Sequence, residues 1–254
     1  MNNSFSITET PLIALFKKVC DTFKNLSDYL YIKFTYDSIN FQVMDDVKIS
    51  VLDISFNKQY FNTFIINYES LICINILDFT KILKNFSKTN IIHFKVENDS
   101  NLLYIESDRN DLIKKKFRIT LLEDNTYKWI NINTINSDNF QISILAKTLQ
   151  TIISELQVFS DYLTIHKSTD SDTLEFIIYE QINNTYSKYE VNGIDIQNTE
   201  DIELTLSIGY LNNLKLLSSF INATINISNN NPFHINLIDD TININYMIAP
   251  KVNT

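Results

Sequence analysis

Glycine is almost absent from this chain, with two residues, Gly193 and Gly209, among 254. A phosphate-binding loop needs several closely spaced glycines so that the backbone can approach the phosphate, and neither glycine has such a neighbour. The sequence therefore lacks the glycine-rich motif of a P-loop or of a dinucleotide-binding fold. Asparagine and aspartate, which tolerate turn geometry, are expected to form the turns instead.

Cysteine and histidine are also sparse, with two and three residues. Cys20 and Cys73 lie in apolar contexts, which is typical of buried thiols in a reducing compartment such as the nucleus or the cytosol. His93, His166 and His234 lie in strand-like segments without an acidic or cysteine neighbour at metal-ligand spacing. Because no motif for a metal, a cofactor or a nucleophilic hydrolase occurs, we expect no cofactor, no metal and no enzymatic activity.

Long uncharged apolar runs are missing too. No stretch approaches the roughly 18 residues of a membrane-spanning helix. With 44% hydrophobic and 20% charged residues, the composition is typical of a soluble globular protein. We therefore expect no membrane partner.

The chain does contain a long internal repeat. The tetrapeptide Ser-Asp-Tyr-Leu occurs at residues 27–30 and again at 160–163, which is 133 residues later. The apolar residues before each copy follow helical spacing; they are Phe16, Val19, Cys20, Phe23 and Leu26 in the first copy, and Leu149, Ile152, Ile153, Leu156 and Phe159 in the second. A period of this length indicates two copies of one domain.

Between these helices, apolar and polar residues alternate as in half-buried antiparallel strands. Each half also has a second candidate helix, at residues 76–86 and 208–220. Residues 123–138 break the periodicity and contain the only tryptophan, Trp129. We expect an α+β chain with domains at 1–122 and 139–254 and a connector at 123–138. The apolar connector residues either pack on the domain beneath them or border a partner-binding groove.

The net charge of −9 argues against a protein that binds nucleic acid over its whole surface. Lysines nevertheless gather on the polar sides of the candidate helices: Lys17, Lys18, Lys24, Lys81, Lys84, Lys88, Lys147 and Lys215. On one helix they would indicate only a solvated face. Their repetition over several helices favours a surface that meets phosphate, binds without reading sequence and weakens with salt.

These features resemble the eukaryotic sliding clamp family, proliferating cell nuclear antigen (PCNA). The resemblance runs in order and nearly end to end through short motifs at residues 15–19 (LFKKV), 40–45 (NFQVMD), 80–84 (TKILK), 210–212 (YLN) and 248–252 (IAPKV). It implies two tandem repeats of the DNA-clamp (processivity) fold, with antiparallel sheets outside and helices lining a ring. The implied function is a homotrimer that encircles duplex DNA and acts as a processivity factor for DNA polymerase.

The resemblance also implies sites and partners. The helix lysines become the DNA-binding surface, which contacts duplex DNA without sequence preference. A pocket for extended partner peptides is implied at Met44, Ile49, Val51, Trp129, Ile130, Pro232, Met247, Ala249, Pro250 and Val252. Subunits are expected to join by antiparallel pairing of edge strands at 114–122 and 183–191, through Lys114, Lys116, Phe117, Ile119, Thr185, Tyr186, Lys188 and Tyr189. Further implied partners are a clamp loader and replication and repair proteins, in the nucleus or at a viral replication site in the cytoplasm.

The chain departs from the family in three places. Ser154, Glu155 and Val158 stand where the third helix is expected to be partly basic, Gly209 replaces an arginine, and the connector has its own pattern at residues 127–130 (YKWI). These departures predict a weaker charge in the second half and a different set of partners, as in a viral clamp or a specialised paralogue. Two alternatives remain: a subunit of a heterotrimeric checkpoint-type clamp, and a clamp-fold viral transcription factor that does not encircle DNA.

Overall fold

The computed structural model describes residues 2–87, 91–98, 100–109, 113–124, 126–132, 140–180, 185–192, 200–213, 217–229 and 231–251. Its internal contacts divide the chain into two units. The first comprises Met1–Lys48, Leu52–Ile130 and Asp239–Ile244, and the second Ile49–Val51, Asn131–Ile238 and Asn245–Thr254. The main part of the first unit thus ends at Ile130, and the expected domain limits at 122 and 138 stay predictions.

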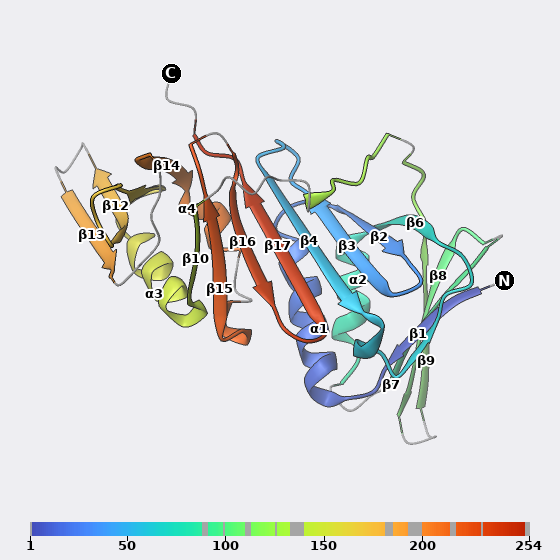
Figure 1. Cartoon of the computed structure of the whole chain (residues 1–254). Helices are drawn as coiled ribbons and strands as arrows, with labels where there is room; N and C mark the ends of the chain where they lie inside the picture. Colours follow the sequence, from blue (N-terminus) through green and yellow to red (C-terminus); the bar gives the residue numbers. More distant parts are fainter. Residues whose placement is uncertain are drawn as a thin grey trace. The chain divides into compact units, whose positions relative to one another are not determined.

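Two sets of strands form the first unit (Figure 1). One sheet has the order β5-β1-β7-β8-β9, with β1 (Asn2–Ile7), β5 (Thr63–Ile65), β7 (Ile91–Glu97), β8 (Leu102–Arg109) and β9 (Ile113–Thr120). The other set has the order β4-β3-β2-β6, with β2 (Tyr29–Phe34), β3 (Ser38–Met44), β4 (Ser50–Asn57) and β6 (Ser70–Asn75). A 3₁₀ turn, η1 (Lys58–Tyr60), follows β4. Buried and less buried residues alternate along β7, as expected for a strand with one face on the core.

Two helices, α1 (Thr10–Phe23) and α2 (Ile76–Lys84), lie side by side in the first unit (Figure 1). Pro11 lies in the first turn of α1, where a missing N–H costs no hydrogen bond. The side chain of Asn75 caps α2 by accepting from the N–H of Asp78 at 3.0 Å. The predicted apolar face of α1 is buried, and the ring of Phe16 packs against that of Phe41 with centroids 5.8 Å apart. Burial of one such side chain contributes roughly 1.5–3 kcal/mol.

The second unit repeats this plan. One sheet has the order β13-β12-β11-β14 and the other strands the order β10-β15-β16-β17. The elements are β10 (Phe140–Leu145), α3 (Ala146–Leu156), β11 (Tyr162–Lys167), β12 (Leu174–Glu180), β13 (Thr185–Val191), β14 (Ile202–Ser207), α4 (Ile208–Leu211), η3 (Leu217–Ser219), β15 (Asn222–Ile227), β16 (Phe233–Ile238) and β17 (Ile242–Ile248). The α+β class predicted from the sequence is confirmed. None of the described helices has the length and apolar character that a membrane span requires.

The two copies of the tetrapeptide make equivalent contacts in the two units. In the first copy the carbonyl oxygen of Asp28 accepts from the N–H of Ile76, the first residue of α2, at 2.9 Å. In the second copy Asp161 accepts from Ile208, the first residue of α4, at the same distance. Each serine hydroxyl also accepts from the tyrosine N–H two residues later, at 3.2 and 3.1 Å, and each leucine is fully buried. The four residues therefore connect the first helix, the next strand and the second helix of a repeat.

Three details differ from the sequence predictions. The helix expected at 208–220 ends at Leu211, because Asn212 and Asn213 form a turn; asparagine competes for backbone hydrogen bonds and is unfavourable inside helices. The helix expected to reach residue 86 ends at Lys84. Phe159, expected on a buried helical face, is 44% exposed because α3 ends at Leu156.

Candidate functional site

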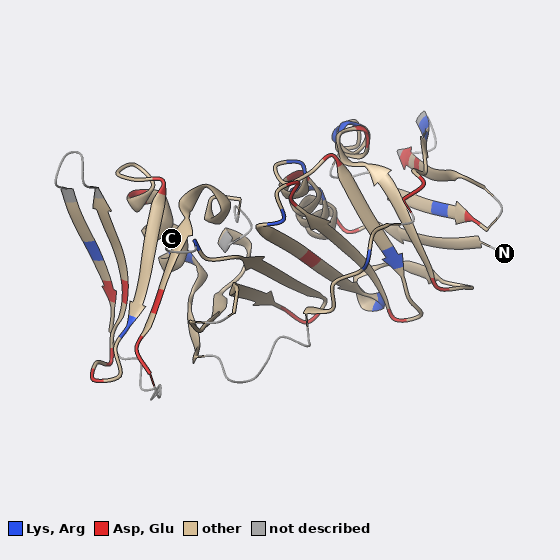
Figure 2. Cartoon of the chain, turned by 90° about the horizontal axis from the view of Figure 1, so that it is seen from above, with Lys and Arg blue, Asp and Glu red and all other residues tan. Residues whose placement is uncertain are grey.

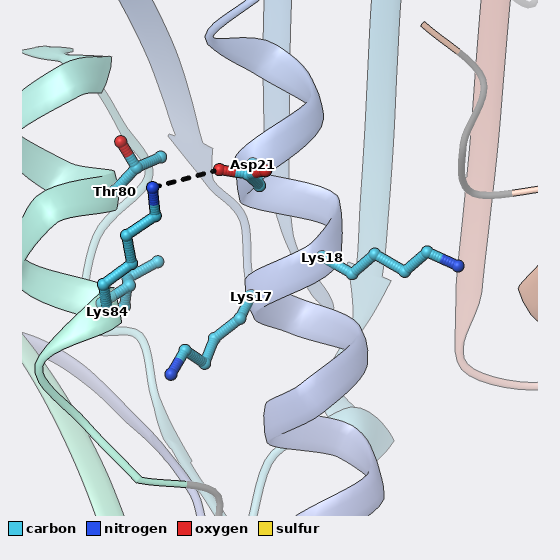
Figure 3. Close-up of a pocket in the computed structure, with 6 residues that line it drawn as sticks. Lys17, Lys18, Asp21, Thr80 and Lys84 are labelled. Carbon is cyan, nitrogen blue, oxygen red and sulfur yellow. Dashed lines mark ion pairs between the residues drawn. The ribbon is translucent and has the colours of Figure 1, made fainter. Parts of the chain in front are cut away.

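A groove with a volume of about 210 Å³ lies between α1 and α2 (Figure 3). It is lined by Lys17, Lys18, Asp21, Thr80, Leu83 and Lys84. Three lysines and one aspartate thus contribute to the lining of the groove, and they come from both helices. Lysine and aspartate both occur on this pair of helices (Figure 2), but in the groove the lysines outnumber the acid. Such a site attracts anions.

Lys17 has a fixed place in this groove. Its Nζ donates to the carbonyl oxygen of Phe86, two residues beyond α2, at 2.6 Å. Lys115, on β9, donates in the same way to the carbonyl oxygen of Asn85 at 2.6 Å. Carbonyl groups at a helix C-terminus carry partial negative charge, which stabilises cations placed there. The two lysines therefore hold the chain that leaves α2.

Other lysines on or next to these two helices form ion pairs with aspartates. Asp21 pairs with Lys24 at 2.6 Å and with Lys84 at 3.9 Å, and Asp78 pairs with Lys81 at 3.6 Å. The side chains of Lys81 and Lys84 are 74% and 67% exposed. Exposed pairs of this kind contribute little to stability. Their ammonium groups can therefore exchange a carboxylate for a phosphate at small cost.

Not every predicted lysine presents its ammonium group in this groove. Lys18 extends away from α2 (Figure 3), and burial lowers its pKa. Lys24 lies just beyond α1, as its C-cap. Lys88, predicted to continue the lysine stripe of α2, lies outside the described residues. Lys215 also lies outside them.

The second unit has a less basic helix surface. Lys147 is exposed on α3, but the same helix carries Glu155, which accepts a hydrogen bond from the hydroxyl of Tyr189. Ser154 is exposed, and Val158, just beyond the helix, is 77% exposed. In the described part of α3 the positive and negative charges therefore balance.

The predicted peptide pocket draws on both units, and each group is described separately. The first unit holds Met44, Trp129 and Ile130, and the second holds Ile49, Val51, Pro232, Met247, Ala249 and Pro250. Within the second unit, the N–H of Ala249 donates to the carbonyl oxygen of Ile49 at 2.8 Å. Val252 lies outside the described residues. The pocket as a whole stays a prediction.

The connector residues near Trp129 pack on the first unit. The ring of Tyr127 stacks on that of Tyr31 with centroids 3.4 Å apart and planes 6° apart. The Lys33 ammonium lies 5.8 Å from the centre of the Trp129 ring, within reach of a cation–π interaction. Of the two explanations for apolar residues in this connector, these contacts favour packing on the domain beneath. No sequence pattern indicated a role for Gln42, a buried residue of β3 that contacts the connector.

The residues predicted for subunit pairing lie on two terminal strands. Among the described strands, β9 and β13 each come last in their sheet. The outward side chains of Lys114 and Lys116 pair across the ladder with Asp108 and Glu106, at 3.8 and 3.2 Å. The inward side chain of Phe117 packs edge-to-face on Phe86, and Ile119 is buried.

On β13, Tyr186 is 59% exposed and Lys188 pairs with Glu175 at 2.8 Å and Glu190 at 2.5 Å. Hydrogen bonds from Lys188, and then from His166, lower the pKa of Glu175. The side chain of Thr185 is not among those described. Both terminal strands therefore present charged and aromatic side chains beside backbone edges that can accept another strand.

Two of the three histidines are engaged in polar pairs. His166 Nδ1 lies 3.0 Å from Glu175 Oε2, and His234 Nε2 lies 3.0 Å from the side-chain oxygen of Asn245. Within the described ranges, no cluster of three or more histidine, cysteine, aspartate or glutamate side chains is placed to hold a metal ion.

Two repeated units of antiparallel sheets and helices, with a basic groove between the helices of the first, define a clamp-type α+β protein. Residues 9–127 match the family "Proliferating cell nuclear antigen, N-terminal domain". This match and the relatives below support a divergent, PCNA-like sliding clamp, so the resemblance seen in the sequence is confirmed.

Curated relatives agree with this family. The DNA polymerase sliding clamp of Nitrosopumilus maritimus is 25% identical over 232 residues, which cover 87% of this chain and 88% of the relative. The DNA polymerase sliding clamp of Thermococcus fumicolans is 24% identical over 253 residues, covering 93% and 94%. That of Cenarchaeum symbiosum is 30% identical over 131 residues, covering 52% and 50%. Two of these similarities extend over both units.

Proposed function

We propose that this sliding clamp assembles as a homotrimeric ring that encircles duplex DNA and acts as a processivity factor for a DNA polymerase. Relatives named DNA polymerase sliding clamp, similar over most of the chain, support the function. The observation that carries the proposal is the groove between α1 and α2, where Lys17, Lys18 and Lys84 gather in a chain whose net charge is −9. Positive charge concentrated on these helices fits a surface that faces DNA.

The contact with DNA is weak because of how the charges are presented. Exposed ammonium groups such as those of Lys81 and Lys84 meet phosphates without fixed geometry, and each contact releases counterions, so that binding weakens as salt rises. A closed ring needs no tight contact, because its link to DNA is topological. A polymerase bound to the ring then stays at a high effective concentration near the primer end.

The clamp acts as a docking platform and not as an enzyme. Extended peptides from a polymerase and from replication or repair proteins occupy the predicted apolar pocket, where flexible methionines such as Met44 and Met247 adapt to different partners. A clamp loader opens the ring to admit DNA. The expected setting is the nucleus, or a replication site in the cytoplasm if the protein is viral.

Subunits join through β9 of one copy and β13 of the next, which pair antiparallel. Both strands come last in their sheets among the described strands, and pairing them satisfies backbone groups that otherwise invite aggregation. Repetition of this head-to-tail contact closes a ring.

The assembly is tested by the mass in solution, measured by sedimentation over micromolar concentrations. The homotrimer predicts three times the 29.6 kDa of one chain. A monomer at every concentration contradicts the homotrimer and favours a subunit that needs different neighbours, as in a heterotrimeric clamp.

A further inference from the structure

One buried side chain of the first unit makes four hydrogen bonds around the connector. Gln42, on β3, is 0% exposed. Its side-chain oxygen accepts from the hydroxyl of Tyr127 at 2.6 Å and from the N–H of Ile130 at 2.9 Å. Its side-chain nitrogen donates to the carbonyl oxygen of Ile130 at 2.9 Å and to Oδ1 of Asp53, on β4, at 2.8 Å. These four bonds use both lone pairs and both N–H groups of the amide.

These four hydrogen bonds require a side-chain amide of the length of glutamine at position 42. Ile130 presents both its N–H and its carbonyl oxygen to Gln42, as it would to a neighbouring strand. A carboxylate at position 42 has no donor for the carbonyl oxygen, and an apolar side chain satisfies neither group. Because buried polar groups without partners are costly, the connector has little freedom to shift along this site.

Neighbouring side chains hold the same segment from other sides. The hydroxyl of Tyr31 donates to the carboxylate of Asp124, while its ring stacks on Tyr127. The Lys33 ammonium lies against the ring of Trp129. Burial raises the pKa of Asp53 to about 6, opposed by the hydrogen bond from Gln42 and by the charge of Lys33. Both the backbone and the aromatic rings of the connector are thus engaged on the first unit.

We propose that Gln42 is the positioning residue of the connector, and that it holds residues 127–130 in one place on the first unit before any partner arrives. A partner peptide then meets a preformed border and does not have to order it, which lowers the entropic cost of binding. Only the binding of a partner peptide next to the connector rests on the proposed function. The position of the connector is a property of the free chain and is tested on it.

The chain contains its own probe, since Trp129 is its only tryptophan and lies within the positioned segment. The test compares Gln42→Met, which keeps the length of the side chain and removes its hydrogen bonds, with the matched control Gln141→Met at an exposed position on β10. Acrylamide quenching of Trp129 reports exposure of the connector, and far-UV circular dichroism reports the fold. We expect quenching to rise about twofold or more in Gln42→Met at unchanged secondary structure, and to stay at the wild-type value in the control. Wild-type quenching in a folded Gln42→Met protein overturns the proposal.

A second variant covers the case in which Gln42→Met does not fold. In Gln42→Glu at pH 8, the new carboxylate faces the carboxylate of Asp53 and the carbonyl oxygen of Ile130, so quenching should rise above that of the wild type. At pH 5, below the pKa of about 6 that burial gives Asp53, this carboxyl group is mostly protonated, the repulsion between the two carboxyl groups falls, and quenching should fall towards the wild-type value. Two other charged residues lie beside the same segment: Lys33 is next to the Trp129 ring, and Asp124 accepts from Tyr31. Both are present in the wild type and in the variant. Quenching equal to the wild type at both pH values overturns the proposal, whether or not the chain forms a ring.

Discussion

Lys17 on α1 donates a 2.6 Å hydrogen bond to the carbonyl oxygen of Phe86, just beyond the end of α2. This bond links α1 to the chain just beyond α2, the two helices between which the basic groove lies. Lys17 therefore has a structural role. Lys81 and Lys84 differ from it, because they are mostly exposed and pair with carboxylates on the helix surface. The lysines of the predicted DNA-binding set are therefore not equivalent.

The first prediction concerns stability. Replacing Lys17 by Met removes a hydrogen bond from a charged donor, and should lower the free energy of unfolding by about 1–2 kcal/mol. Lys81→Met removes only an exposed ion pair, and should change it by about 0.5 kcal/mol or less. Urea denaturation measures both values. Equal effects of the two substitutions would show that the bond from Lys17 to Phe86 does not hold the helices.

The second prediction concerns DNA. Reversing the charge in Lys81→Glu/Lys84→Glu should lower polymerase processivity several-fold and reduce the salt dependence of DNA binding, because two phosphate contacts are lost. The mass of the assembly should not change. Lys58→Glu is the control, since Lys58 is also an exposed lysine in an ion pair but lies on η1. If both variants support wild-type processivity, Lys81 and Lys84 are only part of a solvated helix face.

The third prediction concerns pH. The folded protein binds the proton of Asp53 more tightly than the unfolded chain does, because its pKa is about 6 in place of 3.8. The stability that this proton contributes is complete below pH 3.8 and is lost as pH rises through about 6. Relative to Asp53→Asn, the wild type should therefore lose up to about 3 kcal/mol of unfolding free energy between about pH 3 and pH 7. Parallel pH profiles of the two proteins in urea denaturation would show that Asp53 does not titrate in this way.

The fourth prediction concerns assembly. The N–H of Leu121 donates to Asn101 across the β8–β9 ladder, so the N–H groups of even-numbered residues on β9 point away from β8. Proline at position 116 should therefore remove a donor from the free edge and leave the ladder intact. Lys116→Pro should fold and sediment as a monomer. Lys115→Pro breaks the ladder and should lower the melting temperature. A trimeric Lys116→Pro protein would exclude β9 as the pairing edge.

Local patterns predicted the repeated parts of the fold. The spacing of Phe16, Val19 and Phe23 places these residues on one buried face of α1, because helical geometry depends only on neighbouring residues. The copied tetrapeptide likewise marks two equivalent sets of hydrogen bonds, through Asp28 and Asp161. The edge positions of β9 and β13 followed from the family resemblance and not from periodicity.

Features that depend on distant contacts were missed. Gln42 belongs to a motif that was recognised, but its role depends on Ile130, which is 88 residues away and lies in a segment without periodicity. The end of α4 was missed because its apolar spacing continues past Leu211, while Asn212 and Asn213 turn the backbone. In the case of Gln42, side-chain hydrogen bonds to a distant segment decide its role, and an apolar pattern does not report them.

A topological link to DNA is the central claim, and threading tests it directly without a loader. The clamp is mixed with linear duplex DNA whose biotinylated ends are then blocked with streptavidin, and the complex is washed at high salt. A topological link predicts that clamp added before the ends are blocked is retained, whereas clamp added afterwards is washed away, because salt screens the lysine contacts but cannot open a closed ring. Retention that does not depend on the order of addition, or loss in both cases, would contradict it.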